Sequence, residues 1–80
     1  MMSVQCKMAR AALGLGVREL ANLAKVSPDT VARLERGEAL RDRTLDDIRL
    51  ALEQAGIEFI AENGGGAGVR FRERRSDKGA

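Results

Sequence analysis

The charged side chains are the groups in this sequence that could do chemistry, because its 80 residues include no His, Trp or Tyr. Cys6 is the only cysteine, and Phe59 and Phe71 are the only aromatic residues. Without His, the chain lacks the usual general base and the commonest metal ligand, and a single Cys forms neither a zinc site nor an internal disulfide. Adjacent carboxylates such as Asp46 and Asp47 diverge on a helix and make no catalytic pair. We therefore expect no enzyme, no catalytic residue, no cofactor and no metal.

The placement of the charges limits the partners that the chain could bind. The formal net charge is +2, but residues 1–68 carry 9 basic and 10 acidic groups, whereas residues 69–80 carry 5 basic and 2 acidic groups. Two Phe are too few to stack the bases of a single strand, and no apolar run approaches the ~18 residues of a membrane span. A free cysteine in a short chain is typical of a reducing compartment. We expect a cytoplasmic protein with no membrane partner and no small-molecule ligand.

Up to residue 56 the apolar residues recur at helical spacing and predict four helices. Ser27 is typical of an N-cap, with Pro28 at the first position of the third helix, and Thr44 with Asp47 is typical of a capping box that begins the fourth. Glycines at 14, 16, 37 and 56 are expected at the helix ends. The expected buried faces are, in chain order, Val4, Met8, Ala12 and Leu15; Val17, Leu20, Ala21 and Ala24; Val31 and Leu34; and Leu45, Ile48, Leu52 and Ala55.

The pattern changes to period two after residue 56 and predicts a β-hairpin over residues 57–73. The glycine-rich stretch 63–68 is expected to form its tip; a phosphate-binding P-loop would need a Lys-Ser/Thr ending and a following helix, and the stretch has neither. Residues 74–80 are expected to be a disordered charged tail. The predicted fold is thus mainly α, a compact four-helix domain over residues 1–56 followed by a short C-terminal hairpin.

The second and third expected helices are joined by only Lys25 and Val26, which is too short a link for antiparallel packing. Ala21 is small where the two helices would cross, and Val31 and Leu34 are apolar where the pair would lie on the core. Such a helix pair holds its second member out as a rigid rod that fits the major groove of DNA, which is about 12 Å wide.

Three stretches of the chain carry a family motif, and residues 26–37 are the most specific part. They read Gly16-Val17-Arg18-Glu19-Leu20-Ala21, Val26-Ser27-Pro28-Asp29-Thr30-Val31-Ala32-Arg33-Leu34-Glu35-Arg36-Gly37 and Thr44-Leu45-Asp46-Asp47-Ile48. Over residues 5–55 the sequence resembles the lambda-repressor/Cro-like helix-turn-helix family, also called the XRE family.

Two positions depart from the family's pattern. The family usually begins the second helix with Ser or Thr and then Gln, whereas this chain has Gly16 and Val17, so a phosphate contact there is expected only from a backbone N–H. Lys25 stands where the family usually has Gly. A positive φ is therefore expected at Lys25, at a cost of about 1 kcal/mol.

The resemblance implies that the start of the third helix faces base edges through Pro28, Asp29 and Arg33. Arg33 can donate two hydrogen bonds to guanine O6 and N7, Asp29 can accept one from cytosine N4, and Pro28 offers only apolar contact. Ser27 and Thr30 are expected to bind phosphate or to cap the helix. The alternative is that all five are ordinary solvated helix residues.

The resemblance also implies a phosphate clamp over residues 36–44. Arg36, Arg41 and Arg43 would neutralise backbone phosphates, and the N-terminus of the fourth helix at Thr44 would present free N–H groups. Arg43 could also reach a narrowed minor groove. The alternative is a solvated loop of mixed charge.

A structural ion pair is implied at Arg10 and Glu35, because the matching residues of the family join the first helix to the third beneath the surface. Breaking one side of such a buried pair costs about 3–5 kcal/mol. Cys6 and the Met residues are expected in packing or at the N-terminal surface.

A single module of this kind offers few base contacts, so a two-fold homodimer that reads half-sites about 34 Å apart is expected. Most family members continue with a fifth helix where this chain has the strand pattern. A lone two-stranded hairpin is marginal in water, so the dimer contacts are expected in a sheet shared between chains, at Ile57, Phe59, Val69 and Phe71. The alternative is an intramolecular flap that covers the chain's own helices.

These features predict a sequence-specific, double-stranded DNA-binding transcriptional regulator. We expect a dimeric repressor that reads a palindromic operator with the helix at residues 28–36 and acts by occupancy. One alternative is an antitoxin, which would use the same domain for autoregulation and the C-terminal segment to bind a toxin protein. Another is an interaction module with no role on DNA. Salt-dependent duplex binding separates the last from the first two, and a co-purifying toxin separates the second from the first.

Overall fold

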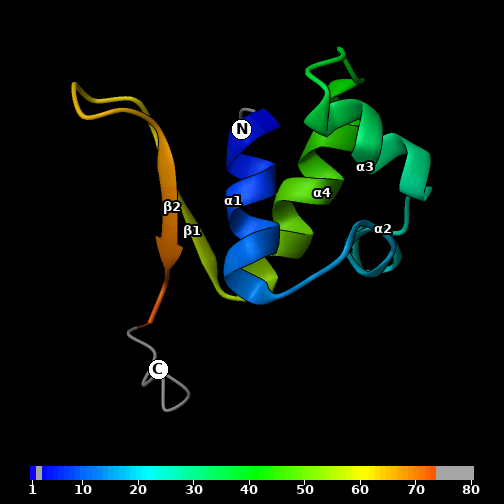
Figure 1. Cartoon of the computed structure of the whole chain (residues 1–80), viewed down its shortest axis with the longest axis horizontal. Helices are drawn as coiled ribbons and strands as arrows, with labels where there is room; N and C mark the ends of the chain where they lie inside the picture. The colour runs from blue at the N-terminus through cyan, green and yellow to red at the C-terminus, as the bar shows by residue number, and fades with distance from the viewer. Residues whose placement is uncertain (2, 74–80) are drawn as a thin grey trace.

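The computed structural model of the chain describes residues 1 and 3–73, which form four helices and a two-stranded antiparallel hairpin (Figure 1). The elements are α1 (Ser3–Leu13), α2 (Val17–Ala24), α3 (Pro28–Glu35), α4 (Asp42–Gln54), β1 (Ile57–Ile60) and β2 (Gly68–Phe71). The predictions of a mainly helical chain and of a C-terminal hairpin are confirmed. The tail expected at residues 74–80 lies outside the described residues.

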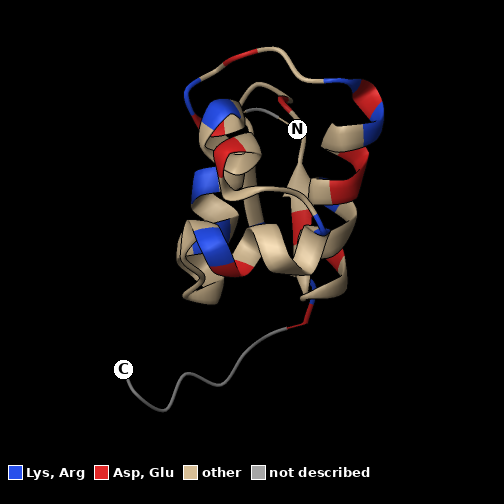
Figure 2. Ribbon diagram, turned by 90° about the vertical axis from the view of Figure 1, so that its right-hand side faces the viewer, with Lys and Arg blue, Asp and Glu red and all other residues tan. Residues whose placement is uncertain are grey.

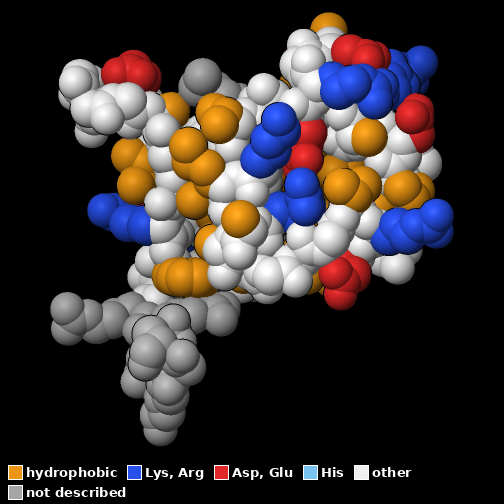
Figure 3. Space-filling model, in the orientation of Figure 1, with side chains coloured by type: hydrophobic (Ala, Val, Ile, Leu, Met, Phe, Trp, Pro, Cys, Tyr) orange, Lys and Arg blue, Asp and Glu red, His pale blue; other side chains and the backbone are white. Residues whose placement is uncertain are grey.

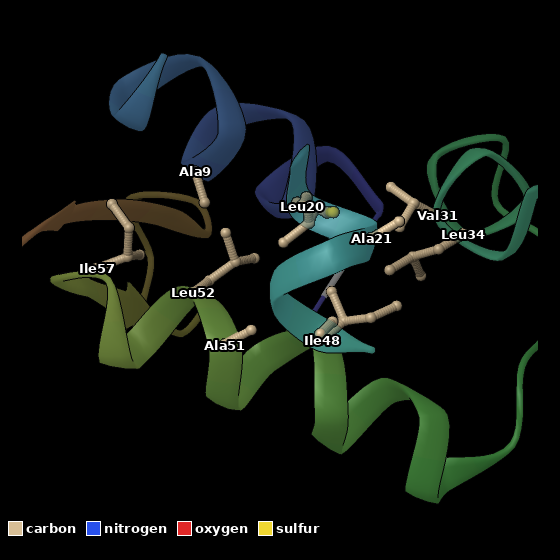
Figure 4. Close-up of a cluster of buried hydrophobic side chains, with 11 residues drawn as sticks. Ala9, Leu20, Ala21, Val31, Leu34, Ile48, Ala51, Leu52 and Ile57 are labelled. Atoms are coloured by element: carbon tan, nitrogen blue, oxygen red, sulfur yellow. The ribbon is translucent and has the colours of Figure 1, made fainter. Parts of the chain in front are cut away.

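The core lies among the four helices, and Ile57 of β1 completes it. Figure 1 shows α1 and α4 standing between the hairpin and the α2–α3 pair, and Figure 4 shows Leu20 of α2 at the centre, between α1 and α4. Each fully buried Leu or Ile contributes roughly 1.5–3 kcal/mol to stability. The largest fully buried side chains are Leu20, Ile48, Leu52, Ile57, Val31 and Cys6.

The predicted buried face of α1 is wrong. Val4 and Met8 remain 42% and 38% exposed, and Ala12 is exposed as well. Apolar spacing missed the true face because one of its members is a polar side chain that finds hydrogen-bond acceptors inside the fold. The buried residues of α1 are Gln5, Cys6 and Ala9.

The hairpin turns its apolar side toward the helices of its own chain. Its register pairs Ile57 with Phe71 and Phe59 with Val69, so these four side chains share one face of the ribbon. Ile57 is fully buried, and the other three are partly buried against the core. On the opposite face Arg70 Nε donates to Glu58 Oε1 at 2.9 Å. The four residues expected at a dimer contact therefore cover their own helices within the single chain.

Gln5 fastens the hairpin to α1. Its amide Nε2 donates to the carbonyl oxygens of Ile60 and Gly68, both at 3.0 Å. Ile60 and Gly68 are cross-strand partners, the pair nearest the hairpin tip. One buried amide thus holds both strands against α1 at the point where the hairpin begins to leave the helices.

We expect Gln5→Leu to lower the free energy of unfolding by about 1–3 kcal/mol, because both carbonyls lose the donor that satisfies them in a partly buried position. Urea titration followed by circular dichroism measures the change. Gln54→Leu, the same substitution at an exposed position of α4, is the matched control and should stay within about 0.5 kcal/mol of the parent. Equal stability of the two variants would contradict the role given to Gln5.

Candidate functional site

α2 and α3 are joined by a tight turn at Lys25. Lys25 has φ 59° and ψ 42°, and among the described residues it is the only non-glycine with positive φ. The N–H groups of Lys25 and Val26 donate to the carbonyls of Asn22 and Ala21 at 3.3 and 3.0 Å, the hydrogen-bond pattern of a Schellman motif. The left-handed backbone predicted at Lys25 is confirmed. It turns the chain sharply enough that three residues separate the two helices.

The start of α3 is held by its cap. Ser27 Oγ accepts a hydrogen bond from the Thr30 N–H at 3.1 Å, and the hydroxyls of Ser27 and Thr30 lie 2.8 Å apart in a second hydrogen bond. Pro28 occupies the first helical position, so the predictions for both the N-cap and the proline are confirmed. Pro28 and Asp29 are exposed on this first turn.

A surface hollow of about 520 Å³ lies between α3 and the beginning of α4. It brings together residues from the turn before α3, the body of α3, the loop into α4 and the first turn of α4. Four of the predicted contact residues, Pro28, Asp29, Arg36 and Arg43, are exposed outside its lining. The predicted contact residues that line it are Ser27, Thr30, Arg33, Arg41 and Thr44.

Glu38 lies between two of the predicted DNA-contacting arginines. Its Oε1 accepts from Arg33 Nε at 3.2 Å, and its Oε2 accepts from Arg36 Nε at 2.9 Å. The bond from Arg36, followed by that from Arg33, holds the pKa of the Glu38 carboxyl below its ordinary value. This cluster was not predicted from the sequence. The available signal was Gly37, which allows the chain to turn back at the end of α3 and bring residue 38 over the helix.

The basic and acidic groups alternate along the loop from α3 into α4, as Figure 2 shows. In the space-filling view, basic side chains gather with acidic ones among them at the upper right, where Figure 1 shows the end of α3 and this loop (Figure 3). The surface around α3 is therefore a set of arginines interleaved with carboxylates rather than a uniformly basic patch.

The predicted start of α4 at Thr44 is wrong, because the helix begins at Asp42 with Arg41 as its N-cap and no side-chain cap bond. Leu40 packs against the core immediately before the helix, so the chain turns into α4 directly after it. Asp42 then lies in the first turn, where a carboxylate interacts favourably with the helix dipole. The N–H of Thr44 still belongs to the first turn, whose N–H groups have no acceptor within the helix.

Arg10 and Glu35 form the expected pair between α1 and α3. Arg10 Nε and Nη2 each donate to one oxygen of the Glu35 carboxylate at 2.8 Å. The side chains are 24% and 8% exposed. Arg10 Nη1 also donates to the carbonyl of Leu15 at 3.1 Å, and the Cys6 thiol donates to Glu35 Oε2 at 3.3 Å. This network lies beneath α3 and fixes its position relative to α1.

The hydrogen bonds and burial of this network shift the pKa values of its members. The hydrogen bond from Arg10 lowers the pKa of Glu35, and the same bond raises the pKa of Arg10. Burial, and then the hydrogen bond to Glu35, raises the pKa of the Cys6 thiol to about 12. The Cys6 thiol is thus protonated at neutral pH and donates a hydrogen bond to Glu35, while its side chain packs in the core.

Comparison with known proteins adds no relative, because neither a protein-family model nor a curated protein matches the chain. None of the described helices is both long enough and apolar enough to cross a lipid bilayer.

The Arg10–Glu35 pair predicts a pH dependence of stability. Because the pKa of Glu35 is lowered by folding, the stabilisation is present above the unfolded value of about 4.3 and is lost as pH falls through the lower folded value. We expect Glu35→Gln to cost about 3 kcal/mol at pH 7, and this difference from the parent chain should shrink as pH falls from 5 to 3.

Urea titrations at several pH values measure this difference. Asp46→Asn removes a carboxylate from an exposed ion pair with Arg49 on α4 and should change stability by less than about 1 kcal/mol. A deficit of Glu35→Gln that stays constant from pH 7 to pH 3 would show that the charge of Glu35 is not what stabilises the fold.

Proposed function

We propose that the chain is a sequence-specific, double-stranded DNA-binding protein of the helix-turn-helix kind, with α3 as its reading helix. The observation that carries the proposal is the three-residue link between α2 and α3, which leaves the first turn of α3 exposed beside the hollow that Arg33 and Arg41 line. A helix presented in this way fits the width of the major groove.

The contacts divide by chemistry into base readout and backbone positioning. Arg33 is half-exposed on α3 and carries the donor pair that matches guanine O6 and N7, while Asp29 can accept from cytosine N4. Arg41 and Thr44 line the same hollow as Arg33, and the Arg41 side chain and the first-turn N–H of Thr44 suit phosphate oxygens. Arg43 lies on the first turn of α4 and adds to the neutralisation of phosphate charge.

We also propose that two copies act together as a repressor by occupancy, because one such module reads too few base pairs to define an operator. The hairpin face is turned inward, so the surface left for a second copy is a free hairpin edge together with the exposed side of α1. Figure 3 shows hydrophobic side chains gathered over α1 and the adjoining hairpin. Val4 and Met8, both exposed, lie on α1, which packs beside β2. We propose that the second copy adds a strand at that edge, beside this exposed side of α1.

The proposal is tested by comparing Arg33→Ala with Arg41→Ala on duplexes that differ at single base pairs, over a range of salt concentrations. We expect Arg33→Ala to lose about 1–3 kcal/mol of discrimination at one position. Arg41→Ala should weaken binding to all sequences alike and reduce the salt slope by about 1. Fluorescence anisotropy with labelled duplexes measures both quantities.

Arg49→Ala is the matched control, because Arg49 is an exposed arginine of α4 that lies outside the hollow. It should keep the affinity, the salt slope and the base preference of the parent chain. Indistinguishable profiles for Arg33→Ala and Arg41→Ala would refute the division between base and phosphate contacts, and a parent chain that binds no duplex would refute the function itself.

A further inference from the structure

We propose that Glu38 is a specificity-determining residue that positions Arg33 for guanine and restrains Arg36 from phosphate. This inference rests on the proposed DNA-binding function and concerns the same surface. Glu38 itself contacts no base and acts through the two arginines that its carboxylate binds.

The backbone places Glu38 over the end of α3. Gly37 has φ +89°, a conformation that L side chains adopt only with strain. The N–H of Gly37 donates to the Leu34 carbonyl at 2.9 Å, and the N–H of Glu38 donates to the carbonyl of Arg33 at 3.0 Å. This Schellman pattern ties the main chain of Glu38 to that of Arg33, and from this backbone position the carboxylate reaches the Arg33 side chain.

The contact with Glu38 selects which edge of Arg33 stays available. A guanidinium can bind two acceptors either along its side, through Nε and one terminal nitrogen, or at its end, through both terminal nitrogens. Glu38 occupies Nε at 3.2 Å. Among the described residues none accepts a hydrogen bond from Nη1 or Nη2 of Arg33. The end that remains is the pair of donors that matches O6 and N7 of guanine.

Arg36 is held more completely than Arg33. Its Nε and its Nη2 both lie 2.9 Å from Glu38 Oε2, so its side edge is occupied. In this position the carboxylate also repels an approaching phosphate. Both effects weaken sequence-independent attraction to DNA, which depends on arginines free to neutralise phosphates.

Stability does not explain why a carboxylate is placed here. Exposed ion pairs of this kind contribute about 0–1 kcal/mol, and Arg33, Arg36 and Glu38 are all substantially exposed. An acidic group at the C-terminal end of a helix also faces the negative end of its dipole, which is unfavourable. The two ion pairs of Glu38 therefore add little to the stability of the fold. Their effect is to orient two arginines on the surface proposed to read DNA.

The experiment compares Glu38→Gln with Asp42→Asn, which removes the same charge from an exposed acid at the start of α4. Affinities for a preferred duplex, for the duplex with its guanine replaced, and for an unrelated duplex are measured by anisotropy at several salt concentrations. We expect Glu38→Gln to bind the unrelated duplex several-fold more tightly, and we expect its preference for guanine to fall by about two- to five-fold. Asp42→Asn should strengthen binding to all three duplexes by a similar factor and keep that preference.

The double variant Arg33→Ala/Glu38→Gln separates an effect of Glu38 on the position of Arg33 from a general effect of charge or stability. If Glu38 acts through Arg33, adding Glu38→Gln to Arg33→Ala should cause no further loss of guanine preference, while the unrelated duplex is still bound more tightly. Urea midpoints of Glu38→Gln should match those of the parent chain. A further loss in the double variant, or a guanine preference of Glu38→Gln equal to that of the parent, overturns the role of Glu38 and leaves the DNA-binding function standing. A parent chain with no preference among duplexes overturns both.

Discussion

The bidentate pair between Arg10 and Glu35 is the interaction on which the placement of α3 depends. One planar guanidinium contacts both carboxylate oxygens of Glu35 and the carbonyl of Leu15, so it joins α1, the link between α1 and α2, and the end of α3. Apolar burial favours a collapsed chain but gives little direction, and the side chains at the centre of this core are small or aliphatic. The directional bonds of Arg10 supply the orientation that such a core lacks.

The two ends of α3 are then fixed by different local means. Ser27 caps the first turn and Lys25 sets the angle of entry through its left-handed backbone. At the other end Gly37 turns the chain back, so that Glu38 meets the arginines that α3 exposes. A surface whose charged side chains are already held before a ligand arrives loses less conformational entropy on binding. In the proposed function, arginines that are held in place in this way favour base readout over sequence-independent attraction to DNA.

The elements whose signals are local could be predicted from the sequence. Ser27-Pro28 indicated the start of α3, and Gly37 indicated its end. The alternation around Phe59 and Phe71 indicated the hairpin. Caps, turns and period-two strands can be predicted in this way because they depend on neighbouring residues alone. The buried face of α1 could not be predicted in the same way. Gln5 is buried because its amide meets the carbonyls of Ile60 and Gly68, more than fifty residues away, and apolar spacing cannot count such a residue.

The candidate site likewise has features with local sequence signals and features that depend on tertiary contacts. Thr44 and Asp47 have the residue types of a capping box, yet α4 begins earlier, at Asp42, directly after Leu40 has packed against the core. The positions of Arg33, Arg36 and Arg41 on or beside α3 followed from the motif, whereas their coupling to Glu38 depended on how the chain turns at Gly37. The inward face of the hairpin depended likewise on a tertiary contact, since the same alternation suits a sheet shared between two copies.

The most direct measurement of the central claim is selection of bound sites from a random duplex pool with the full chain. If α3 reads DNA in a two-fold dimer, the bound duplexes converge on an inverted repeat that contains guanine. The centres of its half-sites are then about 34 Å apart, one helical turn, or a whole multiple of that distance. Recovery of duplexes with no shared sequence would contradict base readout by α3, and convergence on a single unrepeated site would contradict the dimer.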